Sequence, residues 1–293
     1  MIFPEVLKKS VEKELSSLFN TETIIKDSEI VGGGCIHNSS RLITNNGIFF
    51  IKWNTTPSSF HNFTVEAKGL QLLSSTNTIS TPKVICVAKV KNYSYLILEF
   101  INSIGKKEDF WENFGHSLAK LHKNTNNKFG LDFDNYIGSL TQVNNFNDDW
   151  VEFFIIERLE KQIRLAEKNN LMDVSTKKSF EHLYSKLNQI FPDEKPSLIH
   201  GDLWSGNFTI GSNGYVVILD PAVYYANREA EIAFTQLFGG FNSKFYQAYN
   251  EEFPMMSNWQ ERMDVYNLYP LLVHLNLFGM SYMGQIRTIL TKY

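Results

Sequence analysis

The first hundred residues combine helical and β-like hydrophobic patterns. Apolar residues three and four positions apart predict an amphipathic helix over residues 3–18, and its apolar stripe consists of Val6, Leu7, Val11, Leu15 and Leu18. A second helical pattern covers residues 62–74. β-like runs lie near residues 23–31, 38–44, 48–53, 83–90 and 95–101. Asn45-Asn46-Gly47 predicts a hairpin turn between the second and third of these runs.

From residue 102 onward, helical patterns dominate. They cover residues 108–124, 149–168, 174–190, 228–238 and most of 258–284. A loop near residue 200 and the strand-like run "YVVILD" interrupt them. A β-rich first third followed by a helical remainder predicts an α+β fold with two segregated lobes. We expect an N-terminal lobe of residues 1–101 and a C-terminal lobe of residues 102–293.

Composition narrows the class of protein. The chain has 293 residues, of which 43% are hydrophobic and 20% charged, which is ordinary for a globular protein with an ample core. A net charge of -3 without a basic stripe argues against a nucleic-acid partner. No run approaches the roughly 18 apolar residues of a membrane span, and the N-terminus lacks a signal-peptide pattern. We therefore expect no membrane partner and a cytoplasmic location.

The stretch "SLIHGDLWSGNFTI", residues 197–210, contains the first candidate catalytic residues. A loop aspartate such as Asp202 can accept a proton from an attacking hydroxyl, and an asparagine oxygen such as that of Asn207 can bind Mg²⁺. Asp220 follows at the tip of what we expect to be a buried strand. Each residue alone is more typical of a turn, a cap or a strand end. Their joint spacing is typical of the catalytic and metal-binding residues of kinase-type phosphoryl-transfer enzymes.

A kinase needs an ATP-binding segment, and one candidate lies upstream. In "VGGGCIHNSS", the amides of Gly32, Gly33 and Gly34 could approach phosphates closely, although a plain hairpin turn fits this segment equally well. Lys52 lies in the apolar run "IFFIKWN", and Glu66 lies 14 residues further among the apolar positions of a helix. A glutamate can position such a lysine to bind the α- and β-phosphates of ATP.

The joint between the lobes is the expected position of the nucleotide. It lies at Glu99-Phe100-Ile101-Asn102, and we expect Glu99 and Ile101 to line the ATP site. His200 is expected to brace the catalytic loop through hydrogen bonds rather than to act as a base.

The segment after Asp220 separates protein kinases from small-molecule kinases. A protein kinase has a long activation segment that ends in an A-P-E-like motif. Here "PAVYYANREAEIAFTQLF" becomes helical within about ten residues, and the sequence contains no A-P-E. Gly201 also stands where protein kinases have an arginine. The sequence therefore predicts a small-molecule acceptor.

The chain resembles the fructosamine kinase (ketosamine-3-kinase) family, within the aminoglycoside-phosphotransferase and choline-kinase-like group, over about residues 25–284. The resemblance rests on the segments "GGGCIHNS", "FFIKWN", "EAKGLQLL", "IHGDLWSGN", "ILDPAVYY", "REAEIAF", "FGGF" and "FYQAYNE". The pattern H-G-D-x-x-x-x-N is common to the whole group. Trp204, "DPA" and "FGGF" are typical of a smaller set of proteins, and the resemblance to the fructosamine kinase family depends on them.

This resemblance implies a bilobal protein-kinase-like fold that uses ATP and Mg²⁺. It also implies transfer of the γ-phosphate to the 3-hydroxyl of a ketosamine, a ketoamine derived from a sugar. The phosphorylated adduct falls apart and frees the amine, so the implied role is deglycation of a metabolite or protein.

Two residues are candidates for contact with the acceptor. The ring of Trp204 could stack on a sugar and attract a cationic nitrogen, or it could lie in the core. The family places its acceptor pocket against the helices that contain His274 and Asn276. For His274, a core histidine with satisfied hydrogen bonds is the interpretation that the sequence itself favours.

The two cysteines have different surroundings. Cys35 follows the three glycines, where amide donors and Lys52 would favour its thiolate. The resemblance makes a redox-linked homodimer through Cys35 conceivable, and a monomer with Cys35 filling a turn is the alternative. Cys86 lies in the apolar run "KVICVAKV" and is expected to be buried and inert.

Two rival functions stay open at the level of sequence. One is an aminoglycoside or choline-type amino-alcohol phosphotransferase of the same fold. The mixed-charge, aromatic-rich C-terminal region suits a polycationic antibiotic less well than a ketosamine. The other is a nucleotide-binding scaffold without activity, which would have no need for all four of Lys52, Asp202, Asn207 and Asp220.

Overall fold

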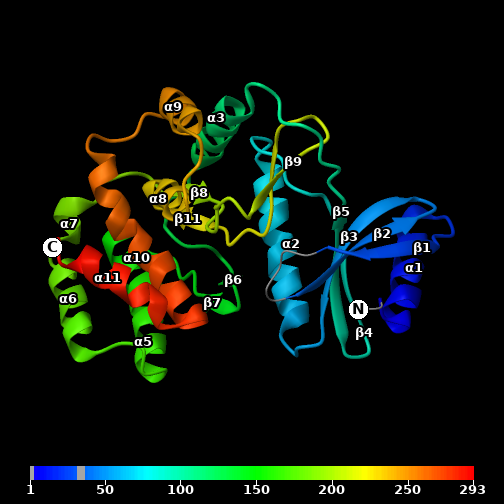
Figure 1. Ribbon diagram of the computed structural model, residues 1–293, viewed down its shortest axis with the longest axis horizontal. Coiled ribbons are helices and arrows are strands. Elements are labelled where there is room, and N and C mark those ends of the chain that lie inside the picture. The colour runs from blue at the N-terminus through cyan, green and yellow to red at the C-terminus, as the bar shows by residue number, and fades with distance from the viewer. Residues whose placement is uncertain (1–2, 32–36) are drawn as a thin grey trace.

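The computed structural model describes residues 3–31 and 37–293, and it has a β-rich N-terminal part and a mainly helical C-terminal part (Figure 1). The N-terminal part contains a five-stranded antiparallel sheet of order β1-β2-β3-β5-β4. Its strands are β1 (Ile25–Ile30), β2 (Asn38–Thr44), β3 (Gly47–Asn54), β4 (Val84–Val90) and β5 (Tyr93–Glu99). The predicted α+β class and the predicted hairpin between β2 and β3 are confirmed.

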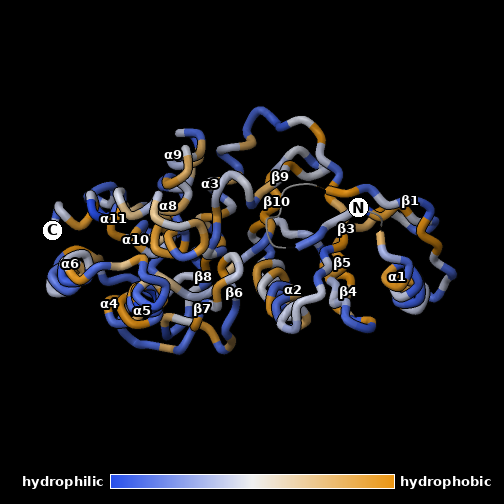
Figure 2. Tube along the Cα trace, turned by 60° about the horizontal axis from the view of Figure 1, so that its bottom comes forward, coloured by the Kyte–Doolittle hydropathy of each residue, from blue (hydrophilic) through white to orange (hydrophobic). Residues whose placement is uncertain are grey.

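Two helices, α1 (Glu5–Phe19) and α2 (Ser59–Ser75), cover opposite faces of this sheet. Successive side chains of a strand point to opposite faces. Ile51 and its neighbours at positions 49 and 53 therefore pack with α1, while Phe50 packs with α2. Hydrophobic and hydrophilic positions alternate around the turns of both helices (Figure 2). Leu18, the last residue of the predicted stripe of α1, lies outside this core and is 50% exposed.

The C-terminal part is built from helices around one large hydrophobic core. These helices are α3 (Phe110–His122), α4 (Trp150–Phe153), η1 (Phe154–Glu160), α5 (Lys161–Lys168), α6 (Val174–Tyr184), α7 (Leu187–Ile190), α8 (Glu229–Leu237), α9 (Ser243–Glu252), α10 (Trp259–Phe278), η2 (Met280–Tyr282) and α11 (Met283–Leu290). None of the helices in the described ranges is long and apolar enough to cross a membrane.

Three short antiparallel ladders complete the C-terminal part. They pair β6 (Asn135–Ile137) with β7 (Leu140–Gln142), β8 (Ser197–Ile199) with β11 (Tyr224–Ala226), and β9 (Phe208–Ile210) with β10 (Val216–Ile218). Every strand of these ladders has only three residues.

Several predicted boundaries need correction. The helix predicted over 149–168 changes to a π-helix between Phe154 and Glu160. The helix predicted over 174–190 is interrupted between α6 and α7. α10 ends at Phe278, and Gly279 follows it with a φ of 89°, which suits glycine. β10 ends at Ile218, so Asp220 is not the tip of the strand but lies beyond it, with a φ of 55°.

Candidate active site

The loop of residues 200–207 is held at both ends by the short ladders. β8 leads into it and pairs with β11, and β9 leads out of it and pairs with β10. Two further backbone bonds tie it to the segment around Asp220: the Ala222 N–H donates to the His200 carbonyl at 2.9 Å, and the Leu219 N–H donates to the Asn207 carbonyl at 2.8 Å. Asp202 and Asp220 therefore lie on two loops fixed side by side.

Gly201 allows these two loops to approach each other. Its φ is 82°, and a Cβ atom at this position would lie 2.1 Å from the Ala222 carbonyl oxygen. Any side chain would both strain the backbone and collide with the neighbouring loop. Glycine stands where protein kinases have an arginine because this close contact leaves no room for a side chain.

His200 braces the loop, as expected from the sequence. Its fully buried ring accepts the Asp202 N–H through Nδ1 at 3.2 Å and donates from Nε2 to the Leu219 carbonyl at 2.8 Å. These bonds assign the neutral tautomer with the proton on Nε2. Burial lowers the pKa of His200 and favours the same neutral state.

Asp202 and Asn207 contact each other across the loop. The Asn207 side-chain amide donates to the Asp202 backbone carbonyl and to the Asp202 Oδ2, both at 2.8 Å. Burial raises the pKa of Asp202 well above its usual range, and the charges of Asp220 and Glu231 raise it further against the lowering effect of the Asn207 hydrogen bond. A carboxylate with a raised pKa is a stronger base than an ordinary aspartate.

Lys52 joins the two parts of the molecule. It projects from the α2 side of β3, and its Nζ lies 2.8 Å from Glu66 Oε1 and 2.5 Å from Asp220 Oδ1. Burial alone would lower the pKa of Lys52, but the two carboxylates raise it instead. Partial burial would likewise raise the pKa of Asp220, although its side chain is half-exposed, and the Lys52 ammonium lowers it. Lys52 is therefore charged, and it stabilises the ionised form of Asp220.

Helix α2 packs close to the segment after Asp220, and this brings Glu66 into range. A Cβ atom added to Gly69 would lie 3.3 Å from Val223 and 3.4 Å from Pro221. The small residue lets α2 pack closely against this segment. Glu66 lies one turn before Gly69, so the same contact positions its carboxylate beside Lys52.

The described residues do not form a ready metal cluster: among them, no three His, Cys, Asp or Glu side chains are grouped to hold a metal ion. Asn207 and Asp220 nevertheless suit a hard cation. The Asn207 side-chain nitrogen is used by Asp202, and in the described part of the chain its Oδ1 takes no hydrogen bond. The Asp220 side chain is 50% exposed. The site thus offers an amide oxygen and a carboxylate, the oxygen ligands that Mg²⁺ prefers.

Two of the remaining candidates for nucleotide binding lie at the end of β5 and just after it. Glu99 ends β5, and its carboxylate accepts the Lys83 N–H at 3.2 Å. Ile101 follows two residues later, outside any helix or strand, and is half-buried. Gly32, Gly33, Gly34 and Cys35 lie outside the described residues, so the roles predicted for them stay predictions.

Cys86 differs partly from expectation, because its side chain is half-buried rather than fully buried. Burial raises the pKa of the Cys86 thiol to about 12, with the charge of Glu14 adding to the shift. The thiol is therefore protonated at neutral pH, which fits the predicted lack of reactivity.

The rings of Trp204 and His274 both contact the ring of Phe238. The ring of Trp204 meets that of Phe238 edge-on at 6.3 Å, and the ring of His274 lies 4.7 Å from Phe238. Trp204 is 37% exposed and therefore does not belong to the core. His274 is half-buried and donates from Nδ1 to the Pro270 carbonyl at 2.7 Å, so one of its ring nitrogens has a satisfied hydrogen bond.

Sequence reasoning missed two polar residues near the site. His37 lies 3.1 Å from the Asn54 amide, and burial together with the charge of Lys52 lowers its pKa to about 4. Glu231 accepts backbone N–H groups of the catalytic loop from α8. The sequence did contain a signal for Glu231, because this acidic residue lies directly beside the apolar run Ile232–Phe234.

Comparison with known proteins places the chain in a family. The fructosamine kinase family model matches residues 7–293. A probable ketoamine kinase of Synechocystis is 36% identical over 289 residues, covering 97% of this chain and 96% of the relative. The chloroplastic protein-ribulosamine 3-kinase of Arabidopsis thaliana is 37% identical over 270 residues, covering 90% of this chain and 81% of the relative.

Solved structures agree. The crystal structure of a protein assigned as a fructosamine-3-kinase from Haemophilus somnus superposes with a TM-score of 0.87 at 29% identity, covering 97% of this chain and 96% of that one. A thermostable mutant of the aminoglycoside phosphotransferase APH(4)-Ia shares the fold, with a TM-score of 0.62 at 15% identity, covering 96% of this chain and 98% of that one. The protein-kinase-like fold implied by the sequence is confirmed, and the chain belongs to the fructosamine kinase family.

Proposed function

We propose that this protein is an ATP-dependent kinase that phosphorylates the 3-hydroxyl of ketosamines, the ketoamine adducts of sugars with amines. The observation that carries the proposal is the convergence of Asp202, Asn207, Asp220 and the Lys52–Glu66 pair at one place in a chain of this family. The names of the relatives, ketoamine kinase and protein-ribulosamine 3-kinase, support the same acceptor class.

The N-terminal lobe, residues 1–101, would bind the nucleotide. Lys52 would neutralise charge on the α- and β-phosphates, and Glu66 would keep its ammonium in position. The glycines at 32–34 would cover the phosphates, and Glu99 and Ile101 would line the nucleotide site at the joint between the lobes.

The C-terminal lobe, residues 102–293, would supply the catalytic groups. Asp202 would orient the acceptor hydroxyl and take its proton at a carboxylate oxygen as the oxygen attacks the γ-phosphorus. The bond between the γ-phosphorus and the bridging oxygen breaks, and ADP leaves. A raised pKa suits Asp202 to this task, because the resulting carboxylic acid is less acidic than usual.

Asn207 and Asp220 would hold Mg²⁺, since they offer the oxygen ligands described above. When bound, Mg²⁺ would neutralise charge on the phosphates. One lysine, Lys52, faces the two carboxylates of Glu66 and Asp220. This local excess of negative charge favours the entry of a cation.

Trp204 would bind the acceptor. Its exposed ring lies two residues after Asp202, close enough to stack on the sugar part of a ketosamine and to attract its cationic nitrogen. His274 would belong to the same aromatic cluster, because its ring lies 4.7 Å from that of Phe238. Loss of the 3-phosphate from the product would free the amine, so the proposed role is deglycation.

The proposal can be tested by ATP consumption in the presence of Mg²⁺. The acceptor panel contains ribulosamines, fructosamines, aminoglycosides and choline. Consumption that depends on a ribulosamine or a fructosamine supports the proposal. ATP consumption that depends only on an aminoglycoside or choline would show that the acceptor is not a ketosamine. Nucleotide binding without turnover of any acceptor would identify the protein as a scaffold without activity.

A further inference from the structure

Two side-chain amides from the hairpin of β6 and β7 reach the segment that follows Asp220. Asn135 and Gln142 are paired directly across this hairpin, and both side chains are buried. We propose that they are positioning residues for Asp220, because they hold the backbone immediately after it and so fix the direction of its carboxylate. This inference rests on the proposed function, since that function makes Asp220 a ligand of Mg²⁺.

The hydrogen bonds of the two amides end on consecutive backbone carbonyls. Gln142 donates from Nε2 to the Ala222 carbonyl at 2.9 Å, and Asn135 donates from Nδ2 to the Val223 carbonyl at 2.7 Å. Ala222 and Val223 are both buried. A buried carbonyl that loses its hydrogen bond lowers stability, so the segment stays where these two donors are. The hairpin therefore determines where the peptide groups that follow Ala222 and Val223 lie.

The backbone of Asp220 needs such support. Its φ is 55°, in the left-handed region that residues other than glycine adopt less often. Such a conformation persists when the surrounding structure fixes the chain on both sides. On the near side, the Leu219 N–H donates to the Asn207 carbonyl at 2.8 Å. On the far side, the two amides of the hairpin hold the chain, and without them the backbone could relax and turn the Asp220 carboxylate away.

The neighbours of Gln142 leave one orientation for its amide. The Tyr269 O–H donates to Oε1 of Gln142 at 2.8 Å, and Nε2 of Gln142 donates to Asn135 Oδ1 at 2.7 Å. Both acceptors of Nε2, this Oδ1 and the Ala222 carbonyl, are oxygens that cannot donate, so a flipped amide would place oxygen against oxygen twice. Because its oxygen and its nitrogen both have buried partners, Gln142 rigidly connects α10 to the segment after Asp220.

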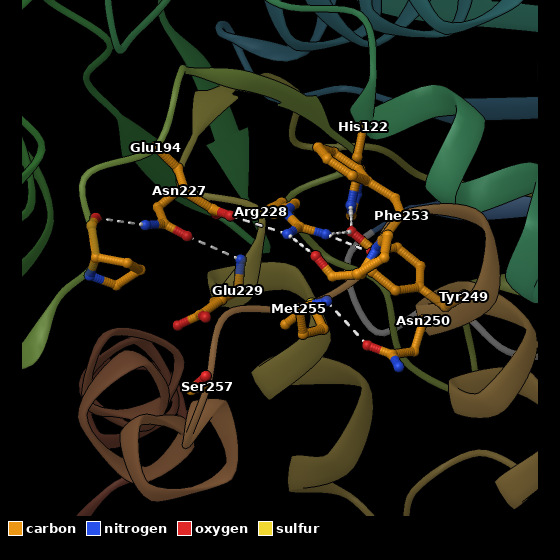
Figure 3. Close-up of polar contacts among 12 residues, drawn as sticks. His122, Glu194, Asn227, Arg228, Glu229, Tyr249, Asn250, Phe253, Met255 and Ser257 are labelled. Carbon is orange, nitrogen blue, oxygen red and sulfur yellow. Dashed lines mark hydrogen bonds and ion pairs between the residues drawn. The ribbon is translucent and has the colours of Figure 1, made fainter.

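Arg158 holds the chain just after the hairpin. It is fully buried in η1, and it donates from Nη2 to the Asn144 Oδ1 at 2.7 Å, while its guanidinium carbon lies 3.9 Å from the centre of the Tyr224 ring. Arg228, another buried arginine, pairs instead with the Glu194 carboxylate at 2.8 Å (Figure 3). The hydrogen-bond acceptors of Arg158 are backbone carbonyls and an amide oxygen. Its charge is therefore stabilised by the chain after the hairpin and by a ring of β11, which keeps the two together.

Gln162 provides a matched control in α5. It is also buried, and its backbone carbonyl and Oε1 accept the Asn276 amide at 3.0 and 2.9 Å. Neither bond involves the hairpin or residues 219–224. Gln142→Met and Gln162→Met therefore each remove a buried side-chain amide, but only Gln142→Met leaves the Ala222 carbonyl without its side-chain donor.

The test titrates both full-length variants with a non-hydrolysable ATP analogue in a calorimeter, with and without Mg²⁺. For Gln142→Met we expect the affinity with Mg²⁺ to fall about 10-fold, as for a lost outer partner of a metal ligand, and the affinity without Mg²⁺ to change less than about twofold. Hydrogen exchange of residues 219–225 in the ligand-free protein should become faster. For Gln162→Met we expect a lower Tm, with the Mg²⁺ dependence and this exchange close to wild type.

Tyr269→Phe gives a second measurement in case Gln142→Met does not fold. It removes only the O–H that donates to Gln142, and we expect the affinity with Mg²⁺ to fall about threefold, as for one lost hydrogen bond. The inference is overturned if Gln142→Met, or Tyr269→Phe in its place, keeps the wild-type Mg²⁺ dependence and exchange. It is also overturned if Gln142→Met and Gln162→Met change both quantities in parallel.

Failure of the proposed function would give a different result. If wild type binds the analogue equally well with and without Mg²⁺, the proposed Mg²⁺ site fails. The exchange of residues 219–225 then decides the anchoring separately. Faster exchange in Gln142→Met alone supports it, and equal exchange in the two glutamine variants overturns it.

Discussion

Lys52 and Asp220 are 168 residues apart in the sequence, yet the Lys52 ammonium lies 2.5 Å from the Asp220 carboxylate. The contact joins β3 of the N-terminal sheet to the loop beyond β10 in the C-terminal part. Glu66 completes the group from α2 at 2.8 Å. The residues proposed to bind phosphate and metal thus lie together although they come from both parts of the molecule.

The first prediction concerns Lys52. Lys52→Met should weaken binding of a non-hydrolysable ATP analogue about 10- to 100-fold, which corresponds to the roughly 1.5–3 kcal/mol of a charge-assisted hydrogen bond. Calorimetric titration in the presence of Mg²⁺ measures this change. Lys177→Met is the matched control, because it removes a half-buried lysine of α6 that pairs with Glu167 at 2.7 Å and has no contact with Glu66 or Asp220. Equal affinities for both variants would show that Lys52 does not bind the nucleotide.

The second prediction concerns stability and pH. The pKa of Asp202 is raised in the folded protein, whereas in the unfolded chain it is about 3.9. The ionised Asp202 carboxylate therefore lowers the free energy of unfolding. This destabilisation is absent below the pKa of Asp202 in the unfolded chain, and it increases with pH until the pH exceeds the pKa of Asp202 in the folded protein. Asp202→Asn should have a higher Tm than wild type at pH 7 to 8, and the difference should shrink as the pH falls towards about 4.

Thermal unfolding without nucleotide or Mg²⁺, measured across this pH range, checks the second prediction. The same variant should lose about 10²- to 10⁴-fold in kcat and still bind ATP. A Tm difference that does not depend on pH would mean that Asp202 is not destabilised by burial.

The third prediction concerns Gly201. Gly201→Ala should lower the free energy of unfolding by about 2–4 kcal/mol, because it combines a strained positive φ with a collision against the Ala222 carbonyl. Gly284→Ala should instead raise stability by up to about 1 kcal/mol, since Gly284 lies in α11 with nothing within 4 Å of an added Cβ atom. Denaturant unfolding of both variants measures the difference. A small or equal effect at Gly201 would contradict the close approach of the two loops.

The fourth prediction concerns Trp204. Trp204→Ala should raise KM for a ketosamine about 10-fold, corresponding to roughly 1–2 kcal/mol of stacking and cation–π attraction, and KM for ATP should barely change. Because the ring is 37% exposed, its removal should leave Tm nearly unchanged. Trp204→Phe keeps a ring and should lose less. A lower Tm together with equal changes in both KM values would assign Trp204 a structural role instead.

Much of the N-terminal part could be predicted because its elements are long and periodic. The stripe of α1 and the turn between β2 and β3 are local patterns. Lys52 and Glu66 could be paired in advance because a strand and the following helix meet at close range. The C-terminal strands could not be predicted in this way, since three residues are too few to show a period of two.

Contacts between distant segments explain the other differences. The π-helix at Phe154–Glu160 and the break between α6 and α7 depend on packing that no local pattern records. The role of Glu231 could not be predicted from its neighbours in the sequence, because its partners come from α3 and from the loop after β8. The left-handed backbone of Asp220 likewise depends on its surroundings, although its spacing from Asp202 was visible in the sequence.

The central claim is that this chain transfers phosphate to the 3-hydroxyl of a ketosamine. The most direct measurement is the identity of the product. Wild type and Asp202→Asn are incubated with Mg²⁺, ATP and a ribulosamine or fructosamine of a free amino acid. Phosphorus–proton correlation NMR then locates any new phosphate on the product. We predict a phosphate on the oxygen of C3 with wild type, followed by release of the free amine, and no such signal with Asp202→Asn. Phosphate on an aminoglycoside or choline but on no ketosamine, or a product that forms equally with Asp202→Asn, would contradict the account.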